Sequence, residues 1–289
     1  MNVLSLFDGM SCGQIALNRA GFKIENYFAC EIDKYAIQVT QANYPNTQQL
    51  GDVTKVSALD LPSLDLVIGG SPCQGFSFAG KQLNFEDQRS RLFFEFVRLL
   101  KEARVKNPEV KFLLENVLMK NEYKEVISEI LGVKPIEINS ALLSAQSRSR
   151  LYWTNCEGVE QPKDKKIVLG DILELEVAEK YYYDKPLIKI DLNKQVCAII
   201  DMKNQDMHKR VFNPNSKVHT LTACGGGNTE KKVLIKGRAR KLTPLEYERA
   251  QTVPDNYTAR VSNSQRYKML GNGWTVDIIA HILQSDISL

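Results

Sequence analysis

Histidines and paired cysteines are scarce in this 289-residue chain. It has three histidines, and none of its six cysteines belongs to a C-x-x-C pair. This scarcity argues against a zinc site and against a disulfide framework, so we predict no metal site. The motif G-x-x-x-x-G-K-[ST] is also missing, and the sequence therefore does not indicate a P-loop nucleotide site.

Long apolar runs are missing as well. No run approaches the roughly 20 residues that span a membrane. The first seven residues lack the basic start and small-residue cleavage site of a signal peptide, and they predict a first strand instead. We therefore expect a cytoplasmic protein without a membrane partner. The 43% hydrophobic content can supply a sizeable core.

Short apolar runs alternate with helical spacing in the first half of the chain. Strands are expected at 3–7, 27–30, 64–68 and 111–114, and helices at 14–20, 34–43, 91–102 and near 123–131. This alternation is typical of an α/β fold with a doubly wound, mostly parallel sheet.

The pattern changes after Trp153. The next stretch is rich in Lys, Asn, Gly and Tyr, and its short β-like runs include 166–169 and 233–235. Helical spacing returns at 244–251 and 275–283. We therefore predict a catalytic and cofactor-binding domain of residues 1–155 plus 241–289, and a small β and loop domain inserted at 156–240.

Cys73 follows the strand predicted at 64–68, within Gly69-Gly70-Ser71-Pro72-Cys73-Gln74-Gly75. In open α/β sheets, ligands bind at the carboxyl ends of the strands. A thiolate at that edge is a nucleophile in position. The alternative is a small buried apolar cysteine, and only its neighbours distinguish Cys73 from the other five.

Other polar residues also follow predicted strands. Phe7–Gly13 is a glycine-containing turn before a helix, which lets a ligand approach the backbone. Glu31 and Asp52 come after the next two probable strands, and an acid there typically holds ribose hydroxyls. Each alone could be an ordinary turn or cap. The ordered set of three indicates a nucleoside-bearing cofactor.

A glutamate and two arginines complete the candidate chemistry. Glu115 ends a strand, where a carboxylate can protonate or hydrogen-bond a heterocycle beside a thiolate. A purely structural buried glutamate is the alternative. Arg148 and Arg150, at positions i and i+2 of a strand, would share one face and could bind a phosphate or a base carbonyl. The alternative is a solvent-facing pair.

Basic residues concentrate late in the chain. Residues 201–241 hold ten Lys and Arg against three Asp and Glu. This excess indicates a polyanionic partner, with a solvated surface as the plainer alternative.

In their order, these segments resemble the motif series of cytosine-5 DNA methyltransferases. The matching segments are Phe7-Asp8-Gly9, Glu31, Asp52, Pro72-Cys73-Gln74, Glu115-Asn116-Val117, Gln146-x-Arg148-x-Arg150 and Gly271-Asn272-Gly273. Lys81–Phe94 resembles the family's mobile catalytic loop, and Leu242–Glu246 with Arg249–Gln251 resembles its late helix. The first motif and Trp274 are closer to the animal de novo methyltransferases. Leu245 stands where many members have arginine.

The resemblance implies methyl transfer from S-adenosyl-L-methionine to C5 of a flipped-out cytosine in duplex DNA. Cys73 would attack C6 of the base. Glu115 would hold N3 and the exocyclic amine, while Arg150 and Arg148 would bind the base O2 or a nearby phosphate. The cofactor contacts implied are Phe7, Asp8, Gly9, Ser11, Gly13, Glu31, Ile32, Asp52, Val53, Pro72, Asn272, Gly273 and Trp274.

DNA contacts are expected from a closing loop and from the inserted domain, which looks like a short target-recognition domain. The residues predicted to touch DNA are Gly80, Lys81, Gln82, Arg89, Arg91, Asn204, Gln205, Arg210, Gly225, Gly226, Gly227 and Asn228. Asn, Gln and Arg side chains can read base edges. Most of the excess Lys and Arg would contact phosphates instead.

Three alternatives stay open: a cytosine-5 methyltransferase acting on tRNA, a non-catalytic DNA-binding regulator on the same fold, and a cysteine hydrolase. The last has no histidine near Cys73 in the sequence. A monomer is favoured, from a bacterium or a phage. The sequence leaves open whether a restriction endonuclease acts beside it and which DNA sequence is the target.

Overall fold

The computed structural model describes residues 1–71 and 91–286. The chain forms two compact units. The first consists of Met1–Ile138, Ser149–Gln161 and Asp277–Leu289, and the second of Asn139–Arg148 and Pro162–Val276. Residues 241–276, which we assigned to the catalytic domain, thus group by contacts with the second unit. The functional division of the chain stays a prediction.

The first unit is built on a seven-stranded sheet with the order β3-β2-β1-β4-β5-β8-β6. Its strands are β1 Asn2–Leu6, β2 Asn26–Cys30, β3 Gln48–Gln49, β4 Leu66–Gly69, β5 Lys111–Val117, β6 Ile136–Asn139 and β8 Ser149–Thr154. The pairs among β1–β5 are parallel, and β8 runs antiparallel to β5. The predicted α/β fold with a mostly parallel sheet is confirmed.

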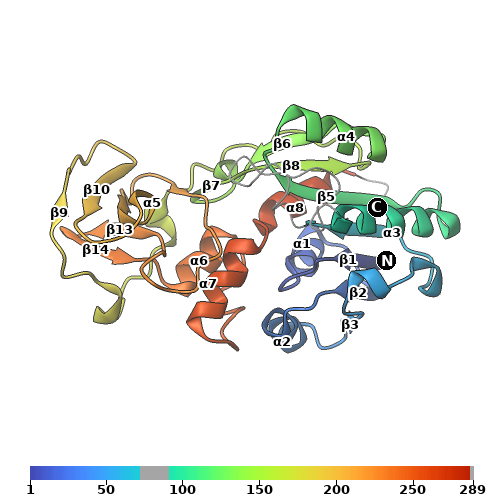
Figure 1. Ribbon diagram of the computed structural model, residues 1–289, viewed down its shortest axis with the longest axis horizontal. Coiled ribbons are helices and arrows are strands. Elements are labelled where there is room, and N and C mark those ends of the chain that lie inside the picture. The colour runs from blue at the N-terminus through green and yellow to red at the C-terminus, as the bar shows by residue number, and fades with distance from the viewer. Residues whose placement is uncertain (72–90, 287–289) are drawn as a thin grey trace. The chain divides into compact units, whose positions relative to one another are not determined.

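Helices follow the strands as expected of a doubly wound sheet, and Figure 1 shows them beside it. They are α1 Cys12–Ala20, α2 Lys34–Asn43, α3 Arg91–Lys106, α4 Asn121–Leu131 and, near the C-terminus, α8 Val276–Gln284. The strand order reverses between β1 and β4, so the ends of these two strands mark the switch point where α/β sheets bind ligands.

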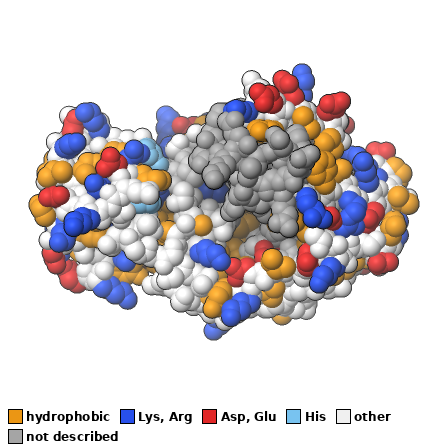
Figure 2. All heavy atoms as spheres, in the orientation of Figure 1, with side chains coloured by type: hydrophobic (Ala, Val, Ile, Leu, Met, Phe, Trp, Pro, Cys, Tyr) orange, Lys and Arg blue, Asp and Glu red, His pale blue; other side chains and the backbone are white. Residues whose placement is uncertain are grey.

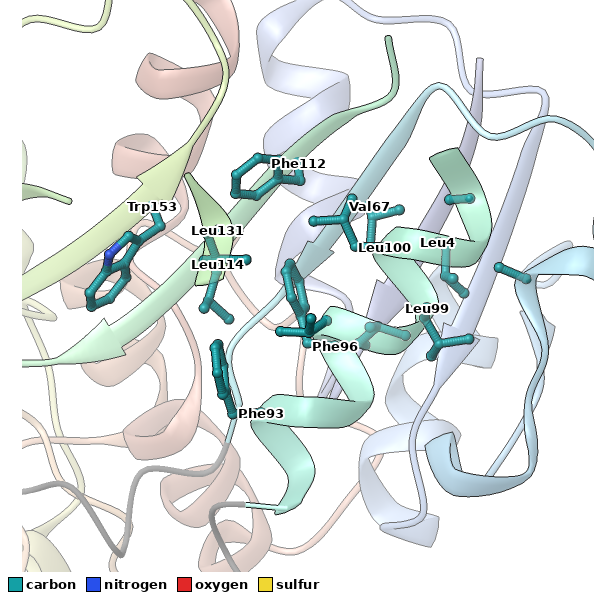
Figure 3. Close-up of a cluster of buried hydrophobic side chains, with 14 of the residues drawn as sticks. Leu4, Val67, Phe93, Phe96, Leu99, Leu100, Phe112, Leu114, Leu131 and Trp153 are labelled. Carbon is teal, nitrogen blue, oxygen red and sulfur yellow. The ribbon is translucent and has the colours of Figure 1, made fainter. Parts of the chain in front are cut away.

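The core of this unit lies where α3 packs on the sheet (Figure 3). Phe93, Phe96 and Leu100 recur at helical spacing on α3 and are fully or almost fully buried. They meet Phe112 and Leu114 of β5, both completely buried. Because β5 is buried here as a near-continuous apolar run, the polar Glu115 and Asn116 that follow stand out against it.

The second unit contains a five-stranded sheet with the order β14-β13-β11-β10-β9 and a short pair, β12-β7. The strands are β7 Gln146–Ser147, β9 Leu187–Ile188, β10 Val196–Ile200, β11 Arg210–Phe212, β12 Val218–His219, β13 Lys232–Ile235 and β14 Arg238–Lys241. Its helices are the single turn α5 Asp206–Lys209, then α6 Pro244–Ala250 and α7 Asn263–Asn272.

One sequence prediction about this unit was wrong, and one helix was missed. The β-like run at 166–169 is not a strand, because Lys166 has a left-handed backbone (φ 56°) and Leu169–Ile172 form a 3₁₀ turn, η4. The helix α7 was not predicted. Its buried side chains are confined to Tyr267–Leu270, which is too short a stretch to show helical spacing in the sequence.

Among residues 1–71 and 91–286, no helix has the length and apolar character needed to cross a membrane.

Candidate active site

The turn after β1 has an unusual backbone. Phe7, Gly9 and Ser11 all adopt left-handed conformations, with φ of 57°, 59° and 61°. Two of these are not glycine, and such residues keep this conformation only where neighbouring groups hold them. A main-chain hydrogen bond stabilises the turn: the Asp8 N–H donates to the Cys30 carbonyl at 3.1 Å, which continues the pairing of β1 with β2.

The Asp8 carboxylate is the centre of a partly buried hydrogen-bond network. The Tyr27 hydroxyl donates to Asp8 Oδ1 at 2.8 Å, and the Ser11 hydroxyl donates to Oδ2. Gln14 Nε2 then donates to Ser11 Oγ at 3.2 Å and to Thr47 Oγ1 at 2.8 Å. Burial raises the pKa of Asp8 from 3.8 to about 6, although the Ser11 and Tyr27 hydrogen bonds act in the opposite direction.

Glu31 ties the ends of β1 and β2 together. Its Oε2 accepts the Gly9 N–H at 2.7 Å, and its Oε1 accepts the N–H groups of Ile32 and Asp33 at 2.7 and 2.8 Å. The adjacent Ile32 side chain is 76% exposed. A carboxylate beside an uncovered apolar side chain is the arrangement that a nucleoside needs for its ribose and its base.

Asp52 lies at the same edge of the sheet. The Leu50 N–H donates to the Ala29 carbonyl at 2.8 Å, which brings this segment beside β2. Asp52 caps the 3₁₀ turn η1 (Val53–Lys55), accepting Thr54 N–H at 3.0 Å and Thr54 Oγ1 at 2.9 Å. These hydrogen bonds lower the pKa of Asp52, and the carboxylate is therefore ionised at neutral pH.

Glu115 and Arg150 form an ion pair across β5 and β8. Glu115 Oε1 lies 2.9 Å from Arg150 Nε, and Glu115 is 8% exposed. Arg150 pairs in register with Val117, two residues along β5 from Glu115, so the two side chains are diagonal neighbours on one face. Two of the predicted site residues are thus in direct contact.

Asn116 connects the end of β5 to the segment after β4. Its Nδ2 donates to Ser71 Oγ at 3.3 Å, and both side chains are buried. Ser71 precedes Pro72 in the chain. The predicted site residues Pro72, Cys73, Gly80, Lys81, Gln82 and Arg89 lie outside the described residues. Arg91 is exposed at the first position of α3.

Arg148 does not share a strand face with Arg150, so that part of the prediction was wrong. It lies between β7 and β8 and is 5% exposed. Its guanidinium donates to the carbonyls of Leu221 at 3.0 Å, Gly271 at 3.4 Å and Gly273 at 3.2 Å. The positive charge at the C-terminal end of α7 also interacts favourably with the helix dipole. These contacts hold the fold of the second unit, and a role for Arg148 toward the base stays a prediction.

Two fully buried glutamines bind some of the same backbone segments as this arginine, and sequence reasoning did not identify their role. Gln146 Oε1 accepts the Leu221 N–H at 2.7 Å, and its Nε2 donates to Gln251 Oε1 at 3.0 Å. Gln251 Nε2 donates to the Leu270 carbonyl at 2.7 Å. Both glutamines stand in quoted motifs, but which groups they would join depends on contacts between residues about a hundred positions apart.

Close packing of the backbone explains the first glycine of the motif Gly271-Asn272-Gly273. A Cβ on Gly271 would lie 2.2 Å from the Thr222 carbonyl carbon and 2.3 Å from the Ala223 nitrogen. Asn272 is exposed at the end of α7, and Trp274 is 9% exposed, mostly a core residue. Contact of Asn272, Gly273 and Trp274 with a cofactor stays a prediction.

The two loops predicted to read DNA lie side by side. Asn204 Nδ2 approaches the carbonyls of Gly227 and Asn228 at 3.5 Å each. The Tyr183 hydroxyl donates to Asn228 Oδ1 at 3.3 Å. The structure therefore brings Asn204 to the predicted glycine loop of residues 225–228. Gln205 is exposed at the start of α5.

Three basic residues of the 201–241 segment, Lys231, Lys232 and Arg240, are buried, and phosphate contact by the other seven stays a prediction. Lys232 is completely buried, and its Nζ donates to the carbonyls of Asn228 and Glu230 at 2.8 Å each. Arg240 forms a buried two-point ion pair with Glu246, at 2.8 and 2.6 Å. On the face drawn in Figure 2, Lys and Arg side chains are scattered among Asp and Glu.

Comparison with known proteins identifies the family. The model of the C-5 cytosine-specific DNA methylase family matches residues 1–133 and 141–287. The type II methyltransferase M1.ScrFI of Lactococcus lactis subsp. cremoris is 31% identical, over 98% of this chain and 77% of that protein. The type II methyltransferase M.HhaI of Haemophilus parahaemolyticus is 29% identical, over 98% and 93%.

Solved structures agree on the fold. The Entamoeba histolytica methyltransferase EhMeth superimposes with a TM-score of 0.74 at 18% identity, covering 99% of this chain and 97% of that one. The S. pombe Dnmt2 methyltransferase gives 0.70 at 19% identity, covering 98% and 97%. With a family model matching nearly its whole length, the chain belongs to the C-5 cytosine-specific DNA methylase family.

Proposed function

We propose that this enzyme transfers a methyl group from S-adenosyl-L-methionine to C5 of a flipped-out cytosine in a specific duplex DNA sequence. The observation that carries the proposal is the Glu115–Arg150 ion pair at the carboxyl end of β5. It supplies a carboxylate for the polar edge of the base and a cation beside it. The Glu31-held turn of residues 7–13 offers the cofactor a backbone surface at the same sheet edge.

The reaction begins at the base. Cys73, as a thiolate, forms a bond to C6, and the electron pair of the C5–C6 double bond moves toward C5. Glu115 holds N3 and the exocyclic amine and stabilises the charge that develops. Arg150 keeps the Glu115 carboxylate oriented through the 2.9 Å contact.

When bound, S-adenosyl-L-methionine supplies an electrophilic methyl group on a sulfonium sulfur. C5 would take the methyl group, the electron pair of the broken S–CH3 bond would stay on sulfur to leave S-adenosyl-L-homocysteine, and C5 would then lose its proton to a base. The C6–S bond then breaks, and the thiolate leaves as the aromatic ring is restored. Base flipping brings C6 within reach at a cost of a few kcal/mol.

The target-recognition role belongs, in this proposal, to the second unit. Its Asn204 and Asn228 are neighbours on two adjacent loops, and amide side chains can read base edges. The relatives named as type II methyltransferases support a place in a restriction-modification system, where the methyl group protects DNA from a matching endonuclease.

A covalent trap tests the reaction. Duplex DNA in which 5-fluorocytosine replaces cytosine should form a stable adduct with the protein in the presence of S-adenosyl-L-methionine, because fluorine cannot leave as a cation. Peptide mapping should place the adduct on Cys73. Cofactor binding without any adduct would support the DNA-binding regulator instead.

Substrate class is tested separately. The protein, with tritiated S-adenosyl-L-methionine, is offered unmethylated genomic DNA and bulk tRNA in parallel. Label in DNA alone is the expected result, whereas label in tRNA alone would contradict the proposal. Sequencing methylated positions in DNA from cells that express the protein would identify the target.

A further inference from the structure

One buried hydroxyl contacts both ends of the turn that follows β1. Tyr27 lies in β2, in register with Val3 of β1, and is 3% exposed. Its hydroxyl donates to Asp8 Oδ1 at 2.8 Å, near the start of the turn. The same oxygen lies 2.6 Å from the point where a Cβ on Gly13 would stand, at the end of the turn.

The turn needs such support. Phe7 and Ser11 are both held in left-handed conformations, which non-glycine residues keep only where the surrounding structure determines them. The Asp8 carboxylate accepts from Tyr27 and Ser11 together, so one acid links the backbone of the turn to β2. Glu31 accepts the Gly9 N–H separately, at 2.7 Å.

Tyr27 has no part in the methyl-transfer chemistry described above. Its ring and hydroxyl are buried, which removes it from direct contact with DNA. The side chain nevertheless meets Asp8 and Gly13, two of the residues expected to form the cofactor site. A phenylalanine at this position would keep the ring in the core and would remove the hydrogen bond to Asp8.

We propose that Tyr27 is a positioning residue for the cofactor: its hydrogen bond to Asp8 holds the turn of residues 7–13 in the conformation that binds S-adenosyl-L-methionine. The inference rests on the proposed function, because it takes S-adenosyl-L-methionine as the ligand of this turn.

The pair is also expected to respond to pH. A hydroxyl donates a stronger hydrogen bond to a carboxylate than to a neutral carboxylic acid. Burial raises the pKa of Asp8 to about 6, so the Tyr27 bond should weaken as the pH falls through that value. The other titratable groups near Asp8 are the Glu31 carboxylate and the Cys30 thiol. Burial raises the pKa of Cys30 to about 12, so this thiol stays neutral.

The experiment measures binding of S-adenosyl-L-methionine by isothermal titration calorimetry, at pH 7.5 and 5.5. The proteins are the wild type, Tyr27→Phe, Asp8→Asn and the double variant. Tyr44→Phe is the matched control, since the Tyr44 hydroxyl accepts a hydrogen bond from Nδ2 of the exposed Asn18 at 3.3 Å.

At pH 7.5 we expect Tyr27→Phe to raise the Kd for S-adenosyl-L-methionine about tenfold, the size of one charge-assisted hydrogen bond. The KM for the cofactor should rise in parallel, while kcat at saturating cofactor and the KM for DNA stay close to wild type. Tyr44→Phe should bind as the wild type does. Affinity of the wild type should fall between pH 7.5 and 5.5 more than affinity of Asp8→Asn.

The outcomes separate the two claims. A wild type that does not bind S-adenosyl-L-methionine overturns the proposed function. A wild type that binds, with Tyr27→Phe binding equally well, overturns the inference alone. If Tyr27→Phe does not fold, the pH profile of Asp8→Asn decides, and a profile equal to that of the wild type contradicts the inference. The inference would also be contradicted if the double variant bound S-adenosyl-L-methionine about tenfold more weakly than Asp8→Asn does.

Discussion

Arg150 Nε lies 2.9 Å from Glu115 Oε1, and the two residues stand on adjacent antiparallel strands as diagonal neighbours. Since both side chains are mostly buried, neither charge is well solvated without the other. The contact therefore supports the fold and orients the carboxylate that the proposed reaction requires. The consequences of removing each partner differ, and they can be measured.

Arg150→Met should lower the free energy of unfolding by about 2 kcal/mol, because a mostly buried carboxylate loses its charged partner. Urea unfolding of the wild type and Arg150→Met measures this difference.

Glu115→Gln keeps the shape of the side chain and removes its charge, so it should reduce kcat strongly while the protein stays folded. An unchanged kcat for Glu115→Gln would exclude a role for its charge in the reaction.

Cys73→Ser should lower turnover at least ~10³-fold, as expected when an activated nucleophile is removed. Binding to duplex DNA, measured by fluorescence anisotropy, should persist. The conservative control is Cys224→Ser, a buried cysteine of the second unit whose thiol lies 4.0 Å from the Tyr247 hydroxyl. Methylation by Cys73→Ser at a rate near wild type would exclude the covalent route.

Gly271→Ala should destabilise the protein by roughly 1–3 kcal/mol or more, since the new Cβ would meet backbone atoms of residues 222 and 223. Gly225→Ala is the matched control, because a Cβ there would have no atom within 4 Å. Thermal unfolding of both variants tests the difference. Equal unfolding temperatures would contradict the packing argument.

Lys232 should give the protein a stability that rises with pH above about 8. Burial lowers the pKa of Lys232 from 10.5 to about 8, so between these values the unfolded chain binds more protons than the folded one. Stability from this group therefore increases as the pH rises from about 8 toward 10.5. Lys232→Met should lose that increase, and the difference between the two unfolding curves measured from pH 7 to 10 isolates it.

Exposed lysines of the two units should differ in their effect on DNA binding. Lys203, exposed beside Asn204, is expected to contact phosphates, so Lys203→Ala should weaken binding to all duplexes and reduce the salt slope by about 1. Lys134→Ala, an exposed lysine of the first unit, is the control and should leave affinity unchanged. An effect restricted to one DNA sequence would mean that Lys203 reads bases.

The fold was predictable because its signals are local. The runs 27–30 and 111–114 lie within β2 and β5, and the helix at 34–43 was predicted with its observed bounds. Apolar spacing reports the face that each element buries, and that face does not depend on distant parts of the chain. Helix α7 was not predicted because only a short part of it has an apolar face, so its sequence lacks this local signal.

The site was predictable only in part. The order of motifs indicated Glu31, Asp52, Glu115 and Arg150. In the structure, Glu31 accepts a hydrogen bond from the Gly9 N–H, and Glu115 forms an ion pair with Arg150. It could not indicate that Arg148 would bind carbonyls of residues 221, 271 and 273. Those partners lie up to 125 positions away in the chain.

By itself, the sequence determined the α/β fold class and the order in which the candidate site residues follow the strands. Both depend on patterns within a few residues. Only the tertiary structure decided which of those side chains meet: Tyr27 with Asp8, Asn204 with the 225–228 loop, and Lys232 with carbonyls inside the second unit. A buried polar group must find a hydrogen-bond partner, and the partner it finds is set by how distant segments pack.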